Sequence, residues 1–401
     1  MTAAIIIVHY HLRPGGVTQV IRATERILGD AGIPHLVLSE ENMAGLGYQA
    51  EASGDLAAPL LDAATRRFGG RPRLWHFHNP CLGKNPALTR SLGALADAGE
   101  AMILQHHDLA EDDRPENLAI LEMVARPYPD SPRVAHAFLN KRDRSAFIAG
   151  GLPGERAILL PNPAPPRPPT PPPPAGPAVV LLPMRGIPRK NLGEFLLLSA
   201  AAPAGTRFLQ GSAPARDEWK PAYEAWRRFA GEQGLPVEFD VFRRQSPERC
   251  IAASTHLLTT SRQEGFGLIH LEAAHRRRVL GRRIASLNLD GFPRDGLYDA
   301  LVCDGIDFAL LDDDHQRAAI HSFRLGKCDV QVVRQGETDL LHPWLRRQLD
   351  DRPPPDASPA LARHSHAAHL KRLTELQARL TSAAPGPVRA LDRRAIAAAY
   401  A

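Results

Sequence analysis

A proline-rich stretch near the middle of the chain, PNPAPPRPPTPPPPAGP at residues 161–177, constrains the fold more than any other feature. Proline fixes its own φ angle and has no backbone N–H to donate, so this stretch can be neither a helix nor a central strand. Proline-rich segments instead form extended, semi-rigid spacers. We therefore expect a linker that divides the 401-residue chain into separately folded parts.

Short apolar runs alternate with helix-like or loop-like segments on both sides of this stretch. The strand-like runs lie at residues 3–10, 35–40, 73–78, 101–107, 133–138 and 156–161, and then at 178–184, 206–211, 236–242, 255–261 and 277–282. Continuous apolar strands separated by helices indicate a parallel sheet that is covered on both faces. The sequence therefore predicts an α/β protein with two Rossmann-like halves.

The expected domain boundaries follow from this alternation. They are an N-terminal Rossmann-like domain at 1–162, a linker at 163–177, a C-terminal Rossmann-like domain at 178–383 and a terminal helix at 384–401 that packs back on the N-terminal domain. The chain after about Asp290 is less patterned, apart from helical segments at 368–383 and 391–401.

Composition and charge exclude several classes of protein. Lys and Arg number 49 against 44 Asp and Glu, and the basic residues are scattered, so a nucleic-acid partner is not expected. The cysteines Cys81, Cys250, Cys303 and Cys328 show no paired spacing, which indicates reduced thiols without disulfides or structural zinc. No apolar run approaches the roughly 20 residues that span a bilayer, and the N-terminus does not read as a signal peptide. We expect a cytoplasmic protein, with peripheral attachment at the inner membrane face left open.

The stretch RPGGVTQV follows the first expected strand. Gly15 and Gly16 let backbone N–H groups approach an anion, and a helix beginning near Val17 points its positive end there. The alternative is a plain tight turn. In a doubly wound sheet, ligands bind beyond the carboxyl ends of the strands, which is where these glycines fall.

The stretch LLPMRGIPRKNLGE follows the first expected strand of the second half. Arg185 and Lys190 supply two cations at a strand end, which suits a diphosphate leaving group, and Asn191 is expected to cap the next helix. Arg189 is expected to face water. The alternative is a solvated basic loop.

The stretch SRQEGFGLIHLEAA places two carboxylates eight positions apart. Glu264 falls in a loop after a strand, and Glu272 falls on the second turn of the following helix. Gly265 and Gly267 free the backbone between them for close approach to a ligand. The alternative, that Glu272 is a solvated residue on the surface of a helix, does not account for the two glycines. We therefore expect Glu264 to contact sugar hydroxyls and Glu272 to hold both hydroxyls of a ribose.

Histidines end two strands of the first half. His76 and His78 share one strand face, and His106, His107 and Asp108 follow the next strand. These side chains are expected to hydrogen-bond a ligand. A metal site that also recruits Asp112 and Asp113, and histidines with purely structural partners, are the alternatives.

Taken together, these motifs resemble the GT-B retaining glycosyltransferases of glycosyltransferase family 4 over most of the chain. The resemblance rests on LRPGGVTQVI, HHDL, LLPNP, MRGIPRKN and TTSRQEGFGLIHLEA, and the last carries the two glutamates separated by seven residues that mark the family. It implies two Rossmann-like domains that face each other across a cleft. The C-terminal domain would hold the nucleotide-sugar donor and the N-terminal domain the acceptor.

The resemblance also implies the site residues. Catalytic roles fall on His107, Glu264, Arg185 and Lys190; donor-binding roles fall on Gly15, Gly16, Arg185, Lys190, Glu264, Gly265, Phe266, Gly267, Leu268 and Glu272. His78, His106 and Asp108 are acceptor-side candidates, with His106 as the fallback for His107. No metal ion and no cofactor are expected, because the cations replace Mg²⁺ and the nucleotide sugar is a substrate.

The implied reaction is transfer of a sugar, with retention, from a nucleotide-diphosphate sugar to a hydroxyl of an unknown sugar, glycerate-type or lipid acceptor. No carboxylate nucleophile is evident on the opposite face of the sugar, which favours front-face displacement over double displacement. The alternatives are another GT-B enzyme, namely a sugar phosphorylase or a nucleotide-sugar epimerase, and a non-catalytic sugar-nucleotide binding protein. One departure from the family pattern is the basic run HRRRVLGRR after Glu272, where a small, glycine-containing turn is usual.

Overall fold

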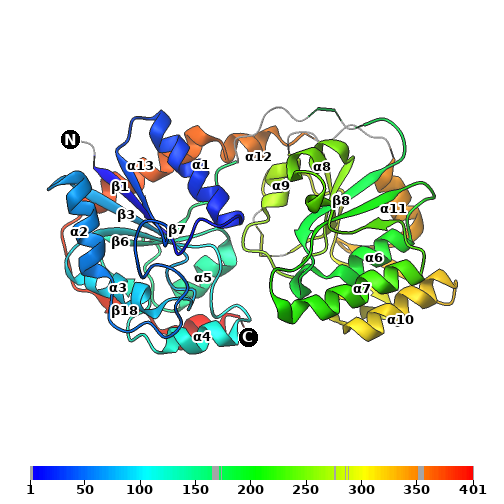
Figure 1. Cartoon of the computed structure of the whole chain (residues 1–401), viewed down its shortest axis with the longest axis horizontal. Helices are drawn as coiled ribbons and strands as arrows, with labels where there is room; N and C mark the ends of the chain where they lie inside the picture. The colour runs from blue at the N-terminus through cyan, green and yellow to red at the C-terminus, as the bar shows by residue number, and fades with distance from the viewer. Residues whose placement is uncertain are drawn as a thin grey trace. The chain divides into compact units, whose positions relative to one another are not determined.

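The computed structural model describes residues 3–164, 171–172, 174–274, 277–284, 286–287, 289–350 and 356–400. It divides into two compact units. Unit 1 comprises Met1–Pro166, Ser286–Asn288 and Ala362–Ala401, and unit 2 comprises Arg167–Ala285 and Leu289–Leu361. Each unit is built on a six-stranded sheet (Figure 1).

The sheet of unit 1 is parallel throughout, as the apolar runs predicted. Its strands, in spatial order, are β2 (His35–Leu38), β1 (Ala4–Val8), β3 (Arg73–His78), β4 (Ala101–His106), β6 (Val134–Phe138) and β7 (Ala157–Leu159). Its helices are α1 (Gly16–Asp30), α2 (Ala57–Phe68), α3 (Pro86–Asp97), α4 (Pro115–Glu122), α5 (Lys141–Ala149), α13 (His366–Ser382) and α14 (Arg393–Ala398). Short strands β5 (Pro129–Asp130) and β18 (Arg389–Ala390) pair antiparallel beside it.

Both faces of this sheet are buried, which explains why its strands are continuously apolar rather than alternating. Ile6 and Val8 of β1 belong to a core that includes residues of α2, α3 and α5. Ile5 and Ile7 point the other way and join a second core with α1 and α13. The single strand AIIIV therefore serves two cores, one on each side.

Helix α13 belongs to unit 1, although we predicted that the second domain extends to residue 383. Leu373, Leu376 and Leu380 of α13 pack in the same core as Ile5 and Ile7. Figure 1 shows α13, in orange, beside α1, in blue. Because these leucines are buried in unit 1, α13 belongs to that unit although it follows unit 2 in the sequence. The chain returns to unit 1 at residue 362. The following helix, α14, packs against α5 of the same unit.

Unit 2 contains a second parallel sheet. Its strands, in spatial order, are β10 (Val237–Glu238), β9 (Arg207–Ser212), β8 (Val179–Arg185), β11 (His256–Thr259), β12 (Arg278–Arg282) and β13 (Leu297–Tyr298). The α-helices are α6 (Leu192–Ala200), α7 (Lys220–Glu232), α8 (Pro247–Ala253), α9 (Leu268–Ala273), α10 (Asp313–Arg324), α11 (Leu341–Leu349) and α12 (Ser358–Arg363), the last of which spans the boundary between the units. Short 3₁₀ turns are η1 (Pro188–Lys190), η2 (Asp217–Trp219), η3 (Val241–Arg243) and η4 (Phe308–Leu310). Helices α6, α7, α10 and α11 share one core with the sheet, and α8 and α9 share the other.

A four-stranded antiparallel sheet follows Asp290, where the sequence pattern predicted little structure. Its order is β15 (Ile306–Asp307), β14 (Ala300–Cys303), β16 (Val330–Arg334) and β17 (Glu337–Leu340). These strands are two to five residues long, and three of them carry charged residues, so their hydrophobic period is weak. Leu301 and Val332 nevertheless lie fully buried in the core of unit 2.

Much of the predicted linker at 163–177 lies outside the described residues, namely 165–170 and 173. Among the residues that the structure does describe, no helix has the length and apolar character needed to cross a membrane.

Candidate functional site

The sheet of unit 2 has a topological switch point between β8 and β11. Strand β9 follows β8 in the chain and pairs on one side of it, whereas β11 pairs on the other side. Ligands of doubly wound sheets bind at such a point, beyond the carboxyl ends of the strands. Strand β8 ends at Arg185 and β11 ends at Thr259, so the predicted site motifs occupy the two loops that flank this switch point.

The two loops are joined by an ion pair between Lys190 and Glu264. Ser261 Oγ donates a hydrogen bond of 2.7 Å to Glu264 Oε1, and Thr260 Oγ1 donates one of 2.7 Å to the backbone carbonyl of Lys190. The side chains of Lys190 and Glu264 are only 10% and 14% exposed. The motifs RKN and SRQEG, which lie more than 70 residues apart in the sequence, therefore form one polar cluster.

The carboxylate of Glu264 is ionised despite its burial. Desolvation by itself would raise the pKa of Glu264, but the charges of Lys190 and Arg189 and the hydrogen bonds from Lys190 and Ser261 outweigh it and hold the pKa below its ordinary value. The cluster therefore combines a fixed negative charge with a fixed positive charge at the end of the sheet.

Arg189 lies at the edge of the cluster: its side chain is 40% exposed, as expected for a residue that faces water, but it also contacts the loop of Glu264. Its Nη1 atom donates to the backbone carbonyl of Gln263 at 3.1 Å and lies 3.6 Å from Glu264 Oε2. The backbone amide of Arg262 also donates to the carbonyl of Arg189 at 2.9 Å. The side chain of Arg185, by contrast, is exposed at the last position of β8. The cluster thus contains Arg189 beside Lys190, and the role predicted for Arg185 stays a prediction.

The glycine-rich loop after Glu264 leads into α9 as the spacing predicted. Gly267 precedes the helix with φ of 74°, a left-handed conformation that favours glycine. Gly265 and Phe266 are half-buried beside it, and Leu268 is the first residue of the helix. Glu272 lies on the second turn of α9 and is half-buried.

A buried polar network that the sequence analysis missed supports the start of α6. Glu194 is fully buried and accepts hydrogen bonds from Asn191 Nδ2 at 3.0 Å, Tyr298 OH at 2.6 Å and Arg282 Nη2 at 2.7 Å. Arg282 also donates to Asp307 Oδ1 at 2.7 Å. The only sequence signal was the departure of the run HRRRVLGRR from the family pattern.

Asn191 occupies the N-cap position of α6, but it does not cap the helix as predicted. Its φ of 50° is left-handed, and its side chain donates to Glu194 instead of accepting a helix N–H. Its Oδ1 atom accepts a hydrogen bond of 3.2 Å from Gln316. The network therefore fixes the backbone turn that immediately follows Lys190.

The described arginines of the basic run are internal structural groups. Arg277 donates to backbone carbonyls at the end of α8, and Arg278 and Arg283 each pair with an aspartate at 2.6 Å. Residues 275 and 276 lie outside the described residues. Together with Arg282, these arginines form hydrogen bonds and ion pairs within unit 2, which gives the described part of the basic run a structural role.

The sheet of unit 1 has its own switch point, between β1 and β3. His9 and Tyr10 follow β1, and they bond to the carboxyl end of β3: His9 Nδ1 lies 2.9 Å from the carbonyl of His78, and Tyr10 OH donates to the carbonyl of Asn79 at 2.7 Å. Asn79 has a φ of 53°, and its Oδ1 atom accepts the backbone amide of His107 at 2.6 Å. The motifs HYH and HFHNP contained His9 and Asn79, but neither residue was predicted to matter.

His107 contacts His78 directly, with 2.8 Å between His107 Nε2 and His78 Nδ1. Both rings are buried, and burial lowers the pKa of His107 to about 3 and that of His78 well below its ordinary value. Both imidazoles are therefore neutral at neutral pH, so His107 acts as a hydrogen-bonding group and not as a charged acid.

The other candidates of unit 1 lie in different surroundings. His106 is buried among aromatic rings and lies 3.1 Å from His136, so its described contacts are those of a core residue, and its acceptor-side role stays a prediction. Asp108 forms an ion pair of 2.6 Å with Arg114. Gly15 and Gly16 are exposed at the start of α1.

A metal site was the alternative role for the strand-end histidines. Within the described part of the chain, no group of three or more His, Cys, Asp or Glu side chains is placed to hold a metal ion. His76 instead bonds through Nε2 to Gln105 Oε1 at 2.7 Å. The strand-end histidines therefore serve as polar links between neighbouring strands.

Solved structures with the same architecture define the fold class. The chain aligns over 93% of its length with 98% of the lipopolysaccharide outer core galactosyltransferase WaaB in its apo form, at a TM-score of 0.53 and 14% identity. It aligns over 94% with 99% of Alr3699/HepE of Anabaena in complex with UDP-glucose, at 0.55 and 13%. It aligns over 95% with the whole catalytic domain of starch synthase IV of Arabidopsis thaliana bound to ADP and acarbose, at 0.52 and 10%. The chain has the GT-B fold of two Rossmann-like domains.

One curated relative is similar in sequence. The chain is 26% identical over 315 residues to the mannosylglucosyl-3-phosphoglycerate synthase of Petrotoga mobilis, over 67% of this chain and 62% of that protein. The matched region thus spans less than two thirds of the relative's length. No protein-family model matches the chain.

Proposed function

We propose that the protein is a retaining glycosyltransferase of family 4 that transfers a hexose from a nucleoside-diphosphate sugar to an acceptor hydroxyl. The observation that carries the proposal is the ion pair of Lys190 and Glu264 at the switch point of unit 2. This pair places a cation and a carboxylate where a doubly wound sheet binds its ligands. The cation can bind a diphosphate, and the carboxylate can accept hydrogen bonds from sugar hydroxyls.

The cations serve the departing diphosphate. On donor binding, the phosphate oxygens would replace Glu264 as partners of Lys190, and Arg185 at the end of β8 would supply a second charge. Charge that develops on the leaving group is then stabilised by groups held in place beforehand. These cations give the neutralisation that Mg²⁺ gives in other transferases, so the proposal is metal-independent.

The carboxylates serve the sugar and the nucleoside. Once Lys190 turns to the diphosphate, Glu264 is free to accept hydrogen bonds from hydroxyls of the donor sugar. Backbone amides of Gly265, Phe266 and Gly267 lie in the same loop, and Glu272 on α9 is assigned to the ribose. The sugar passes through an oxocarbenium-like state, and the acceptor attacks from the face that the diphosphate leaves.

Unit 1 is assigned the acceptor. We keep His107 as the residue near the reacting sugar, acting through a neutral imidazole, and Gly15 and Gly16 as phosphate-side contacts. The name of the curated relative makes hexosyl phosphoglycerates one acceptor class to test, beside free sugars and lipids. We propose a cytoplasmic location.

A donor screen tests the proposal. The full chain is incubated with a panel of UDP-, GDP-, ADP- and dTDP-sugars, and thermal stabilisation and release of the nucleoside diphosphate are measured. At least one donor should stabilise the protein and be turned over. The double variant Lys190→Met/Glu264→Gln should lose both effects, because it removes both charges of the site while leaving no buried charge unpaired.

A matched pair in unit 1 provides the control. Arg73 and Glu100 form an ion pair of 2.7 Å with side chains 18% and 15% exposed, so Arg73→Met/Glu100→Gln makes the same chemical change away from the proposed site. This variant should keep donor stabilisation and turnover. Full turnover in the Lys190/Glu264 variant contradicts the proposal, and sugar release that needs inorganic phosphate but no nucleotide identifies a phosphorylase instead.

A further inference from the structure

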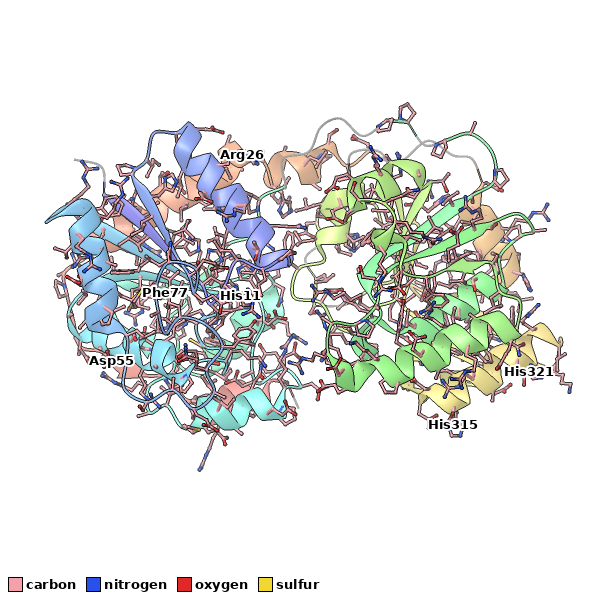
Figure 2. The ribbon with its side chains drawn as sticks, in the orientation of Figure 1. His11, Arg26, Asp55, Phe77, His315 and His321 are labelled. Atoms are coloured by element: carbon pink, nitrogen blue, oxygen red, sulfur yellow. The ribbon has the colours of Figure 1, made fainter. Side chains whose placement is uncertain are left out.

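Three loops of unit 1 meet at the carboxyl edge of its sheet. His11 follows β1, Tyr48 follows β2 and Lys84 follows β3. The ring centroids of Tyr48 and His11 lie 4.9 Å apart, edge to face, and Lys84 Nζ lies 5.8 Å from the Tyr48 ring. Figure 2 labels His11 in the segment between β1 and α1. These loops flank the switch point between β1 and β3, where ligands bind in this class of sheet.

Tyr48 is unusually exposed for an aromatic residue of this protein. Its relative exposure is 49%, whereas the neighbouring Tyr10, 5.2 Å away between ring centroids, is fully buried. Within the described ranges, no other Phe, Tyr or Trp reaches this degree of exposure. A lone exposed aromatic ring at a ligand-binding edge offers apolar area with a polar rim.

The loop that carries Tyr48 is held rigidly. The amide of Asn85, a fully buried residue, donates to the carbonyl of Gly45 at 2.7 Å and to that of Gly47 at 2.8 Å. The backbone amide of Gln49 donates to the carbonyl of Lys84 at 3.0 Å. The backbone around Tyr48 is therefore anchored, and the ring packs against the rings of Tyr10 and His11, which reduces the ordering that a ligand must impose on binding.

The chemistry of this surface selects its ligand. The flat apolar face of a pyranose, lined with C–H groups, matches an aromatic ring, and its hydroxyls match the ammonium and imidazole groups beside that ring. Net charge gives no preference for an anion, because the loop that carries Tyr48 also carries Glu40 and Glu41, and Glu40 pairs with Arg13 of the neighbouring loop at 2.6 Å. A long alkyl chain needs a deeper apolar surface than one ring.

We propose that Tyr48, flanked by His11 and Lys84, is the platform on which unit 1 binds a pyranose ring of the acceptor, so that the acceptor is a saccharide. This inference rests on the proposed transferase function for the word acceptor, but the binding of a sugar to Tyr48 can be measured without turnover. It narrows the acceptor classes to those that contain a sugar ring.

Saturation-transfer NMR on the full chain tests the proposal. The probes are methyl α-D-glucopyranoside, methyl α-D-mannopyranoside and maltose, with glycerate as a probe that lacks a ring. The double variant Lys190→Met/Glu264→Gln serves as the background, so that sugar held in unit 2 does not contribute. Ring C–H protons of at least one saccharide should receive saturation. Tyr48→Ala should raise its Kd about tenfold, which corresponds to about 1.4 kcal/mol of lost stacking.

Matched variants separate stacking from folding. Tyr48→Phe keeps the ring and should bind within about twofold of the parent, since the affinity comes from the ring face. Met123→Ala removes a side chain of unit 1 that is 59% exposed and should change nothing. Saccharide binding that is equal in Tyr48→Ala and its parent overturns the proposal, as does binding of glycerate with no binding of any saccharide, or no binding of any probe. Donor stabilisation of the otherwise unaltered Tyr48→Ala protein is measured separately, so a failed donor screen is not confused with a failed sugar platform.

Discussion

Lys190 and Glu264 neutralise each other's charge at the switch point of unit 2, with both side chains mostly buried. Removing one partner leaves the other charge buried without its main counter-ion. We therefore expect Lys190→Met to lower the free energy of unfolding by about 3 kcal/mol, measured by urea denaturation. Loss of activity in a single variant of Lys190 or Glu264 can therefore be attributed to catalysis only after the stability of that variant has been measured.

The double variant resolves this ambiguity. Lys190→Met/Glu264→Gln should be more stable than Lys190→Met alone, because neither residue then carries an unpaired charge. A double-mutant cycle with Glu264→Gln measures the coupling. Additive losses across the cycle would show that the two side chains do not interact in solution.

Arg282 should contribute more to stability than the neighbouring Arg283. Arg282→Met leaves the fully buried Glu194 without its cation, and we expect a loss of about 3–5 kcal/mol in unfolding free energy. Arg283 pairs with Asp299, but their side chains are 35% and 28% exposed, so Arg283→Met should cost at most about 1 kcal/mol. Equal losses in the two variants would argue against the buried network.

Gly281 should tolerate no side chain. It lies on β12 with a φ of 128°, and a Cβ atom there would meet the carbonyl oxygen of Thr259 on β11 at 1.8 Å. Gly281→Ala should therefore destabilise the protein by about 3 kcal/mol or more. Gly231→Ala is the control: that position in α7 has open space, and alanine there should be stabilising by about 0.5–1 kcal/mol. Thermal melting compares the two.

Unit 1 should lose stability as the pH falls below the ordinary histidine pKa of about 6.5. Burial lowers the pKa of five of its histidines to values of about 3 or about 4, namely His9, His76, His107, His136 and His369. Between 6.5 and these values the unfolded chain binds protons that the folded chain does not, so stability is greatest above 6.5 and falls with pH until the folded-state values are reached. In that window, each such histidine lowers the free energy of unfolding by about 1.4 kcal/mol for every unit by which the pH falls.

Urea denaturation at a series of pH values between about 7.5 and 5 measures this slope. His76→Gln removes one buried titrating group and should make the slope shallower. His315→Gln, on the exposed part of α10 (Figure 2), should leave the slope unchanged. A flat stability profile in this range would mean that the histidines are accessible to protons in the folded protein.

The parallel sheets and the ends of their strands could be predicted from the sequence. The strands are buried on both faces, so each one reads as an unbroken apolar run, and the residues after a run fall at the ligand-binding edge. This reasoning placed Lys190 and Glu264 in separate loops of one site, and the structure joins them. The exposed position of Arg185 and the half-buried position of Glu272 leave their predicted contacts to be tested.

Long-range packing could not be predicted in the same way. The local sequence of α13 does not indicate which sheet its leucines cover. Likewise, the local sequence around Glu194 and Arg282 does not predict that these residues, 88 positions apart, form a hydrogen bond. The strands of the antiparallel sheet are too short, and three of them too polar, to show a hydrophobic period. The surroundings of His106 could not be predicted for a similar reason: adjacent residues at a strand end point to opposite faces, and only the structure shows that His106 packs beside His136 in the core.

The return of the chain to unit 1 at residue 362 has a consequence for biosynthesis. Unit 2 is inserted between parts of unit 1, and it emerges from the ribosome before residues 362–401 of unit 1 are available. Until then Ile5, Ile7 and their neighbours on one face of the first sheet lack the leucines of α13, and the nascent chain carries an uncovered apolar surface. Completion of unit 1 therefore waits until α13 has been synthesised, and we expect a ribosome that stalls within unit 2 to leave an aggregation-prone nascent chain.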